Sequence, residues 1–146
     1  MTIDTSGKWW VGTSPDDIRE YLVALTKDSY LVNEFRLARC DCGVKAFRLE
    51  ADDGEGAARR TCVSCGKEHF ICDSQECWAD AEPEPWRCIE CGSEEANVGV
   101  GFSLYADGEN VRWLYVGVRC ARCGILGSFA DWKVGYGPSL QLMDRV

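Results

Sequence analysis

Eight of the ten cysteines in this 146-residue chain stand in four closely spaced pairs, and these pairs constrain the fold more than any other feature of the sequence. In chain order the pairs are Cys40 with Cys42, Cys62 with Cys65, Cys88 with Cys91, and Cys120 with Cys123. A glycine follows each pair directly. Glycine tolerates the positive φ angle and the close backbone approach of a turn that directs two sulfurs at one point. The pairs therefore indicate either disulfide links in a secreted protein or metal binding in a reduced one.

The rest of the sequence favours metal binding. The chain opens with Met1-Thr2-Ile3-Asp4 and has no basic segment followed by an apolar run, so we expect no secretory signal. No stretch approaches the roughly 20 apolar residues that span a bilayer. We therefore expect a cytoplasmic protein with reduced cysteines and no membrane segment.

Residues 88–124 carry the clearest pattern. Two strand-like runs, 98–105 and 111–118, lie between the last two cysteine pairs and are joined by the turn residues 107–110. A hairpin with a cysteine pair at each base brings four sulfurs together, and four thiolates in a tetrahedron form a structural zinc site with no position open for water. This stretch resembles a zinc ribbon built from two rubredoxin-type knuckles. We expect one structural zinc ion here.

The first two cysteine pairs repeat the same plan. Strand-like patterns run over residues 30–40, 44–50, 58–61 and 67–72. Cys40 and Cys42 are separated by one residue instead of two, but both sulfurs can still reach one metal ion. The chain therefore contains an internal repeat of about 50 residues. We expect a mainly β, small α+β protein with two zinc ribbons in tandem, two zinc ions and one N-terminal helix.

The predicted helix lies in the first part of the chain. Ser14 and Pro15 suit a helix start, and apolar residues then recur at helical spacing up to about Thr26. That apolar stripe, formed by Ile18, Tyr21, Leu22 and Leu25, either packs on a sheet or is offered to a partner. Trp9-Trp10-Val11 likewise either packs on the body or forms an exposed partner-binding peptide. The expected division is 1–29 for the lead and helix, 30–72 for the first ribbon, 73–87 for an acidic linker, and 88–146 for the second ribbon and tail.

Three residues with metal-binding or nucleophilic side chains remain unassigned: Cys72, Cys77 and His69. They are either buried thiols and a hydrogen-bonded imidazole, or a reactive or third metal centre. Alternatively, the two cysteines join Cys88 and Cys91 in a different site, which would leave the knuckle at Cys120 and Cys123 unmatched.

The second hairpin has two distinct faces. One face is aliphatic and is expected to form core, whereas the other carries Tyr105, Trp113 and Tyr115 beside a floor of glycines. The floor is either a docking site for the first ribbon or the helix, or a stacking surface for a partner. A third strand is expected over 125–134, and a short edge strand is expected within the tail, 139–146.

Charge bears on function. The side chains carry a net charge of −8, and two Zn(Cys)4 sites would bring this to about −12, which repels phosphate backbones. Our main hypothesis is a non-enzymatic protein-interaction module, such as an adaptor, an inhibitor or an immunity-type protein, with a basic protein partner. The alternative is a nucleic-acid-binding ribbon protein with a local basic patch made of Arg59, Arg60, Arg112, Arg119 and Arg122. Catalysis is not expected, because His69 is the one histidine and neither a glycine-rich phosphate loop nor an open metal site is present.

Overall fold

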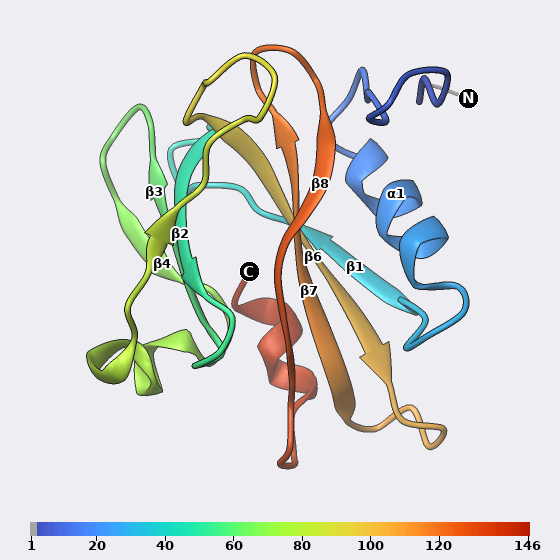
Figure 1. Ribbon diagram of the computed structural model, residues 1–146. Coiled ribbons are helices and arrows are strands. Elements are labelled where there is room, and N and C mark those ends of the chain that lie inside the picture. The colour runs from blue at the N-terminus through green and yellow to red at the C-terminus, as the bar shows by residue number, and fades with distance from the viewer. Residues whose placement is uncertain (1–2) are drawn as a thin grey trace.

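The structure, a computed structural model, describes residues 3–146 and confirms a mainly β fold with an N-terminal helix (Figure 1). The elements are α1 (Asp17–Thr26), β1 (Glu34–Leu37), β2 (Phe47–Asp52), β3 (Ala57–Cys62), β4 (Glu68–Phe70), β5 (Glu84–Pro85), β6 (Ala96–Leu104), β7 (Val111–Cys120) and β8 (Leu126–Lys133). Short 3-10 helices lie at η1 (Ser74–Glu76), η2 (Trp78–Asp80) and η3 (Leu140–Asp144).

The strands form one antiparallel sheet in the order β4-β3-β2-β6-β7-β8, with β1 paired to β6 and β5 paired to β2. The two cysteine-bearing hairpins meet at their bases. Phe47, the first residue of β2, pairs with Cys62 on one side and with Ala96 on the other, and Ala96 pairs with Cys120. The two repeats therefore share a continuous sheet, and the β2–β3 and β6–β7 hairpins diverge from this junction (Figure 1).

The repeats also exchange their first strands. β1 precedes the first cysteine pair but pairs with β6 of the second repeat, whereas β5 precedes the third pair but pairs with β2 of the first repeat. Matching backbone bonds hold both exchanges: Ala38 N donates to Val98 O at 2.8 Å, and Trp86 N donates to Leu49 O at 2.8 Å. Each donor lies two residues before the first cysteine of its repeat, and each acceptor is the third residue of its strand. The exchange is therefore reciprocal: the first strand of each repeat pairs with the hairpin of the other repeat.

The helix begins later than the sequence predicts. Ser14 and Pro15 form a tighter turn in which their carbonyl oxygens accept hydrogen bonds from Asp17 N at 3.0 Å and Ile18 N at 3.2 Å. The carboxylate of Asp17 accepts hydrogen bonds from Thr13 N at 2.9 Å and Ser14 N at 3.1 Å. Asp17 therefore fixes the chain at this end of α1, in the place where a carboxylate favourably meets the helix dipole.

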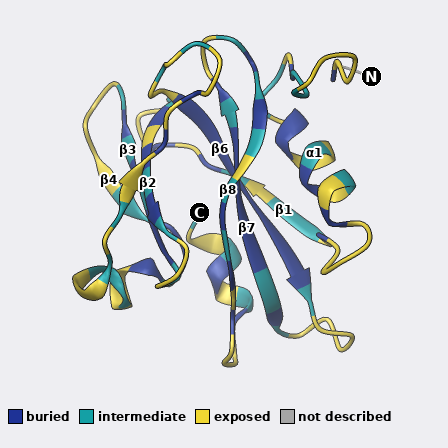
Figure 2. Cartoon of the chain, viewed as in Figure 1, coloured by how far each residue is buried: buried dark blue, intermediate teal, exposed yellow. Residues whose placement is uncertain are grey.

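α1 packs on the glycine floor of the second hairpin. Ile18 and Leu22 are fully buried there, while Leu25 is 52% exposed. One side of α1 is accordingly buried and the other exposed (Figure 2). A Cβ added at Gly117 would lie 2.6 Å from Ile18 Cγ2, and one at Gly99 would lie 2.4 Å from Phe35 Cζ. Because these glycines have no side chains, α1 and β1 approach the sheet closely. The glycine floor is therefore a docking site for the helix, which was one of the two alternatives.

The aliphatic face of the second hairpin forms core, as expected. Val98, Val100 and Phe102 of β6 pack in the same buried cluster as Leu114, Val116 and Val118 of β7. Phe47 and Leu49 of β2 belong to that cluster too. One hydrophobic core therefore lies under both repeats.

The tail differs from the sequence prediction. Residues 139–146 contain η3 instead of an edge strand, because Leu142, 1% exposed, inserts into the shared core. Arg145 O accepts a hydrogen bond from Cys72 N at 2.8 Å, which fixes the tail against the first repeat. The predicted linker contains the short 3-10 helices η1 and η2, and Glu84-Pro85 pairs with β2 although Pro83 precedes it and Pro85 is part of it.

Candidate metal centres

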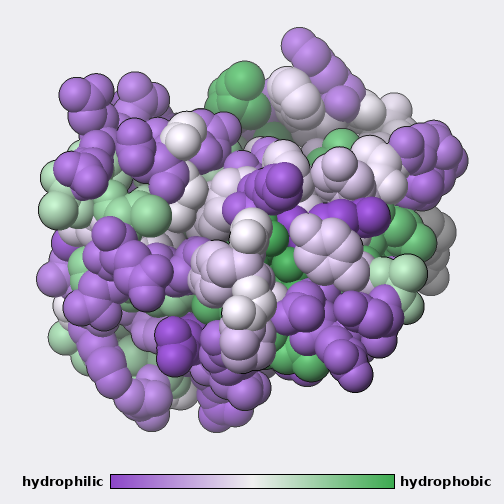
Figure 3. Space-filling view, turned by 90° about the horizontal axis from the view of Figure 1, so that it is seen from below, coloured by the Kyte–Doolittle hydropathy of each residue, from purple (hydrophilic) through white to green (hydrophobic). Residues whose placement is uncertain are grey.

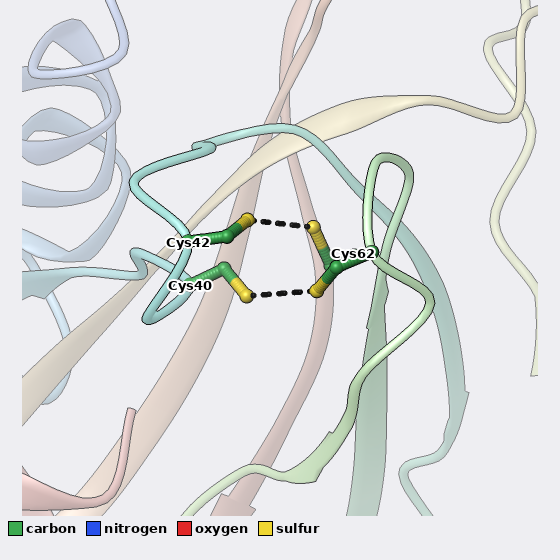
Figure 4. Close-up of side chains that lie close together, drawn as sticks. Cys40, Cys42 and Cys62 are labelled. Carbon is green, nitrogen blue, oxygen red and sulfur yellow. Dashed lines mark hydrogen bonds between the residues drawn. The ribbon is translucent and has the colours of Figure 1, made fainter.

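The first two cysteine pairs form one cluster. Cys40 and Cys42 lie in the loop after β1, Cys62 ends β3, and Cys65 lies in the turn before β4. The four sulfurs all lie within 4.8 Å of one another. Cys40 Sγ lies 3.5 Å from Cys65 Sγ, and Cys42 Sγ lies 3.6 Å from Cys62 Sγ, so the sulfurs of the two loops face each other (Figure 4).

The last two pairs form a second cluster of the same design. Cys88 and Cys91 precede β6, Cys120 ends β7, and Cys123 lies in the turn before β8. Again the first cysteine faces the fourth and the second faces the third, with both Sγ–Sγ distances 3.5 Å. The structure therefore groups the eight predicted cysteines into the two predicted sets of four.

The glycine after each pair closes the turn. Gly66 N donates to Cys62 O at 3.0 Å and Gly124 N donates to Cys120 O at 2.9 Å, and these glycines have φ angles of 76° and 84°. In the shorter Cys40-x-Cys42 loop, Gly43 N reaches Cys40 O at 2.8 Å. This bond spans one residue fewer than those of the other knuckles, so a tighter turn compensates for the missing residue.

The donor set fits a tetrahedral metal ion. A Zn–S bond of about 2.3 Å implies a sulfur tetrahedron with edges of about 3.8 Å, close to the measured 3.5–3.6 Å. Each cluster could therefore hold a metal ion. Four sulfur ligands would fill the coordination shell of a tetrahedral ion, as they do in structural metal sites.

Backbone amides favour thiolate at one cysteine of each cluster. Hydrogen bonds from the amides of Cys65 and Ser64 lower the pKa of Cys62 to about 6. Burial raises the pKa of Cys120, but the amides of Cys123 and Arg122 outweigh it and bring that pKa down to about 7. These amides stabilise the negative charge that metal binding requires.

The three unassigned residues lie outside both clusters. Cys72 is buried, its Sγ lies 3.4 Å from Leu142 O, and burial raises its pKa. Cys77 is half-buried, and burial together with the carboxylate of Asp73 raises its pKa. His69 Nε2 lies 2.9 Å from Arg145 O. The buried thiol and the hydrogen-bonded imidazole of the first alternative are thus found at Cys72 and His69, whereas Cys77 is only half-buried.

The three aromatic residues of the candidate partner surface do not share one exposed face. Tyr115 is 8% exposed, and its hydroxyl donates to Tyr30 O at 3.0 Å beneath the segment that follows α1. Trp113 is half-buried, stacks on Tyr30 at 5.3 Å between ring centroids, and donates to Asp131 Oδ2 at 2.8 Å. Tyr105 is 39% exposed. The N-terminal segment 9–11 also packs on the body, since Trp10 contacts Tyr21 edge to face.

The fold and the two centres define a class: a mainly β protein with two zinc-ribbon-like four-cysteine sites in one antiparallel sheet. Comparisons of the chain with protein-family models, with curated proteins and with solved structures find no match. No helix within residues 3–146 is long and apolar enough to cross a membrane.

Proposed function

We propose that this protein is a non-enzymatic protein-interaction module of the adaptor, inhibitor or immunity type. Two structural zinc ions, held by the two cysteine clusters, stabilise its sheet. It acts in the cytoplasm on a protein partner that presents a basic surface.

The observation that carries this proposal is an acidic end of the molecule. Eight carboxylates come from two segments: Asp52, Asp53, Glu55, Asp73, Glu76, Asp80, Glu82 and Glu84. Neither residues 51–58 nor residues 73–84 contain lysine or arginine. Glu82 N donates to Asp52 Oδ2 at 3.0 Å, and β5 pairs with β2. These contacts hold the two acidic segments side by side. Figure 3, which views the molecule from below relative to Figure 1, shows hydrophilic residues in purple interspersed with pale and green ones.

The carboxylates outnumber the cations at this end, where Lys133 and Arg145 are the cationic neighbours, and such a surface supports recognition of a basic protein. It accelerates association by electrostatic steering, and it disfavours acidic partners and phosphate backbones. The overall charge of −8 acts in the same direction. Association with the partner is therefore expected to slow as salt concentration rises.

The arginines of the nucleic-acid alternative support it poorly. Arg59 forms ion pairs with Glu50 at 2.7 Å and Glu68 at 3.0 Å. Arg119 donates to Gly12 O at 2.9 Å and to Asn97 Oδ1 at 3.0 Å. These contacts occupy two of the five arginines that would have to reach phosphates.

The test combines partner capture with charge variants. Zinc-loaded protein captures its partner from the native cell with and without nuclease, and the purified pair is then measured by surface plasmon resonance. The variant D53N/E55Q/E76Q/D80N is expected to lower the association rate at least tenfold, because it neutralises half of the acidic end. The control E20Q/D28N/E95Q/E109Q removes the same charge from exposed positions elsewhere. An equal effect of both variants, or a capture lost with nuclease, would count against the proposal.

A further inference from the structure

A hollow of about 470 Å³ opens beside the first cysteine cluster. It lies between the Cys40 loop, strands β3 and β4, and the tail residues 143–146. The charged side chains that line it are Arg36, Arg39, Arg60, Lys67, Asp41 and Asp144. Four cationic side chains thus face two carboxylates, on a protein whose net charge is −8.

Arg60 is the central feature of the hollow. It is 6% exposed, because its position on β3 directs it to the core face, where its guanidinium lies 4.5 Å from the centre of the Phe47 ring. Its Nε donates to Val146 O at 2.8 Å. Within residues 3–146 its terminal nitrogens have no hydrogen-bond partner. These terminal nitrogens are not shut away from solvent, so they open into the hollow and are available to an anionic ligand.

A second arginine with open donors lines the same hollow. Arg39 is exposed, and no hydrogen bond or ion pair involves its side chain within the described chain. By contrast, Lys67 forms an ion pair with Asp41, and Arg36 lies 3.4 Å from Glu34. The guanidinium N–H groups in the hollow that have no acceptor therefore belong chiefly to Arg39 and Arg60.

We propose that this hollow is a binding site for a small phosphate monoester. Guanidinium groups bind phosphate oxygens in bidentate fashion, and charge-assisted bonds of this kind are strong where water is partly excluded. The volume lies within the range of small-molecule sites and exceeds what a bare phosphate needs. Leu37 and Met143 also line the hollow and give an organic group apolar surface to contact. This site is separate from the acidic end and from the proposed protein partner.

Arg60 has one competing role, as a counter-charge for the thiolates of the first cluster. Cys40 lines the hollow; burial lowers the pKa of Arg60, and the charges of Cys40 and Cys62 act against this shift. The two roles predict different results. A counter-charge affects metal retention, whereas a ligand-binding arginine affects phosphate binding at unchanged zinc content.

The experiment titrates zinc-loaded full-length protein with phenyl phosphate, followed by calorimetry and by amide NMR shifts. Saturable binding with a submillimolar Kd is expected, with benzoate at least tenfold weaker. R60Q and R39Q should each weaken phenyl phosphate binding at least tenfold. R48Q is the matched control, since Arg48 is exposed on β2 and does not line the hollow. A phosphoserine pentapeptide, run in parallel, distinguishes a free phosphate ester from one carried by a protein.

Zinc content and circular dichroism are measured for every variant. If R60Q loses zinc or folds poorly, R39Q alone decides the matter, because Arg39 is exposed and has no structural partner in residues 3–146. Absence of saturable binding at about 10 mM phenyl phosphate would overturn the proposal. Equal weakening in R39Q and R48Q would do so as well, since it would indicate only diffuse electrostatic attraction.

Discussion

Cys62 and Cys120, one from each metal cluster, lie in the same row of the sheet, separated only by Phe47 and Ala96. Neighbouring strands lie about 4.8 Å apart, so the two cysteine Cα atoms are roughly 14 Å apart across three strand spacings. All four residues are buried. The two centres are therefore joined by backbone hydrogen bonds and by a shared core, and a disturbance at one should reach the other.

The first prediction concerns this coupling. Cys65→Ser removes one thiolate from the first cluster at an exposed position. We expect the bound zinc to fall from two ions towards one, and the protein to unfold in a single transition at a lower temperature. The second site should also release its zinc to a chelator several-fold faster, because the Phe47–Ala96 junction is loosened. Zinc-release kinetics and thermal circular dichroism measure both effects.

Cys77→Ser is the control for that experiment, because Cys77 is a half-buried thiol outside both clusters. It should leave the zinc stoichiometry and the release rate unchanged. Two separate unfolding transitions in Cys65→Ser, with a second site of normal stability, would show that the repeats fold independently despite their exchanged strands.

The second prediction is that removal of the metal unfolds the protein. Structural zinc supplies on the order of 10 kcal/mol of folding free energy in small metal-binding domains, and the knuckles hold the bases of both hairpins. Without metal, the cysteines of each cluster must lie with their sulfurs 3.5–3.6 Å apart and no cation between them. Far-ultraviolet circular dichroism with a strong chelator should show loss of the β signal. A retained spectrum and melting point after proven metal loss would contradict this.

The third prediction concerns the glycine floor beneath α1. In Gly117→Ala the new Cβ would lie 2.6 Å from Ile18 Cγ2 and 3.0 Å from Leu22 Cδ1, so the helix must shift. Overpacking of this kind typically lowers the free energy of unfolding by about 1–3 kcal/mol. Urea denaturation measures the change.

Gly127→Ala on β8 serves as the matched control. The nearest atom to its added Cβ is Val118 Cγ2 at 3.6 Å, an ordinary contact, so stability should change by less than about 0.5 kcal/mol. Ile18→Ala removes the Cγ2 atom that the new Cβ would meet, so it should cost less stability in the Gly117→Ala background than in the Gly127→Ala background. Equal stability of the two alanine variants would mean that α1 does not rest on the floor as described.

The local features of the fold could be predicted because short sequence patterns determine them. The knuckle spacing groups the cysteines, and the alternation in residues 98–104 and 111–118 separates core from floor. The strand exchange could not be predicted, since four residues of β1 carry no signal for whether β2 or β6 is their partner. The same holds for the tail, where only the shared core makes a buried site for Leu142.

The hollow beside the first cluster was missed for a related reason. Arg59 and Arg60 look alike in the sequence, but strand alternation directs Arg59 towards Glu50 and Glu68 and directs Arg60 onto the core face. Arg39 and Lys67 stand next to the cysteine loops in the sequence, and only the closed cluster brings them together. The sequence pattern that could have indicated this hollow is the presence of basic residues directly beside the paired cysteines.

The last prediction concerns His69, the one histidine in the chain. Burial lowers its pKa below the ordinary value of 6.5, and the charges of Arg60 and Lys67 act in the same direction, against Arg145 O and Asp41. Because the folded pKa is depressed, both states hold a neutral imidazole well above pH 6.5, and the full stability is present there. Below pH 6.5 the unfolded chain binds a proton first, so stability is lost as the pH falls towards the folded pKa.

Two measurements check this. The imidazole Cε1 proton gives a single resonance, whose NMR titration should have its midpoint below pH 6.5. Between pH 7.5 and 5.5, the zinc-loaded wild type should also lose more unfolding free energy than His69→Gln, which cannot take up the proton. Acid-driven release of zinc affects both proteins, so the difference between them isolates the imidazole. A midpoint at or above 6.5, or equal losses in the two proteins, would mean that His69 is solvated and does not pack beside Arg60 and the tail.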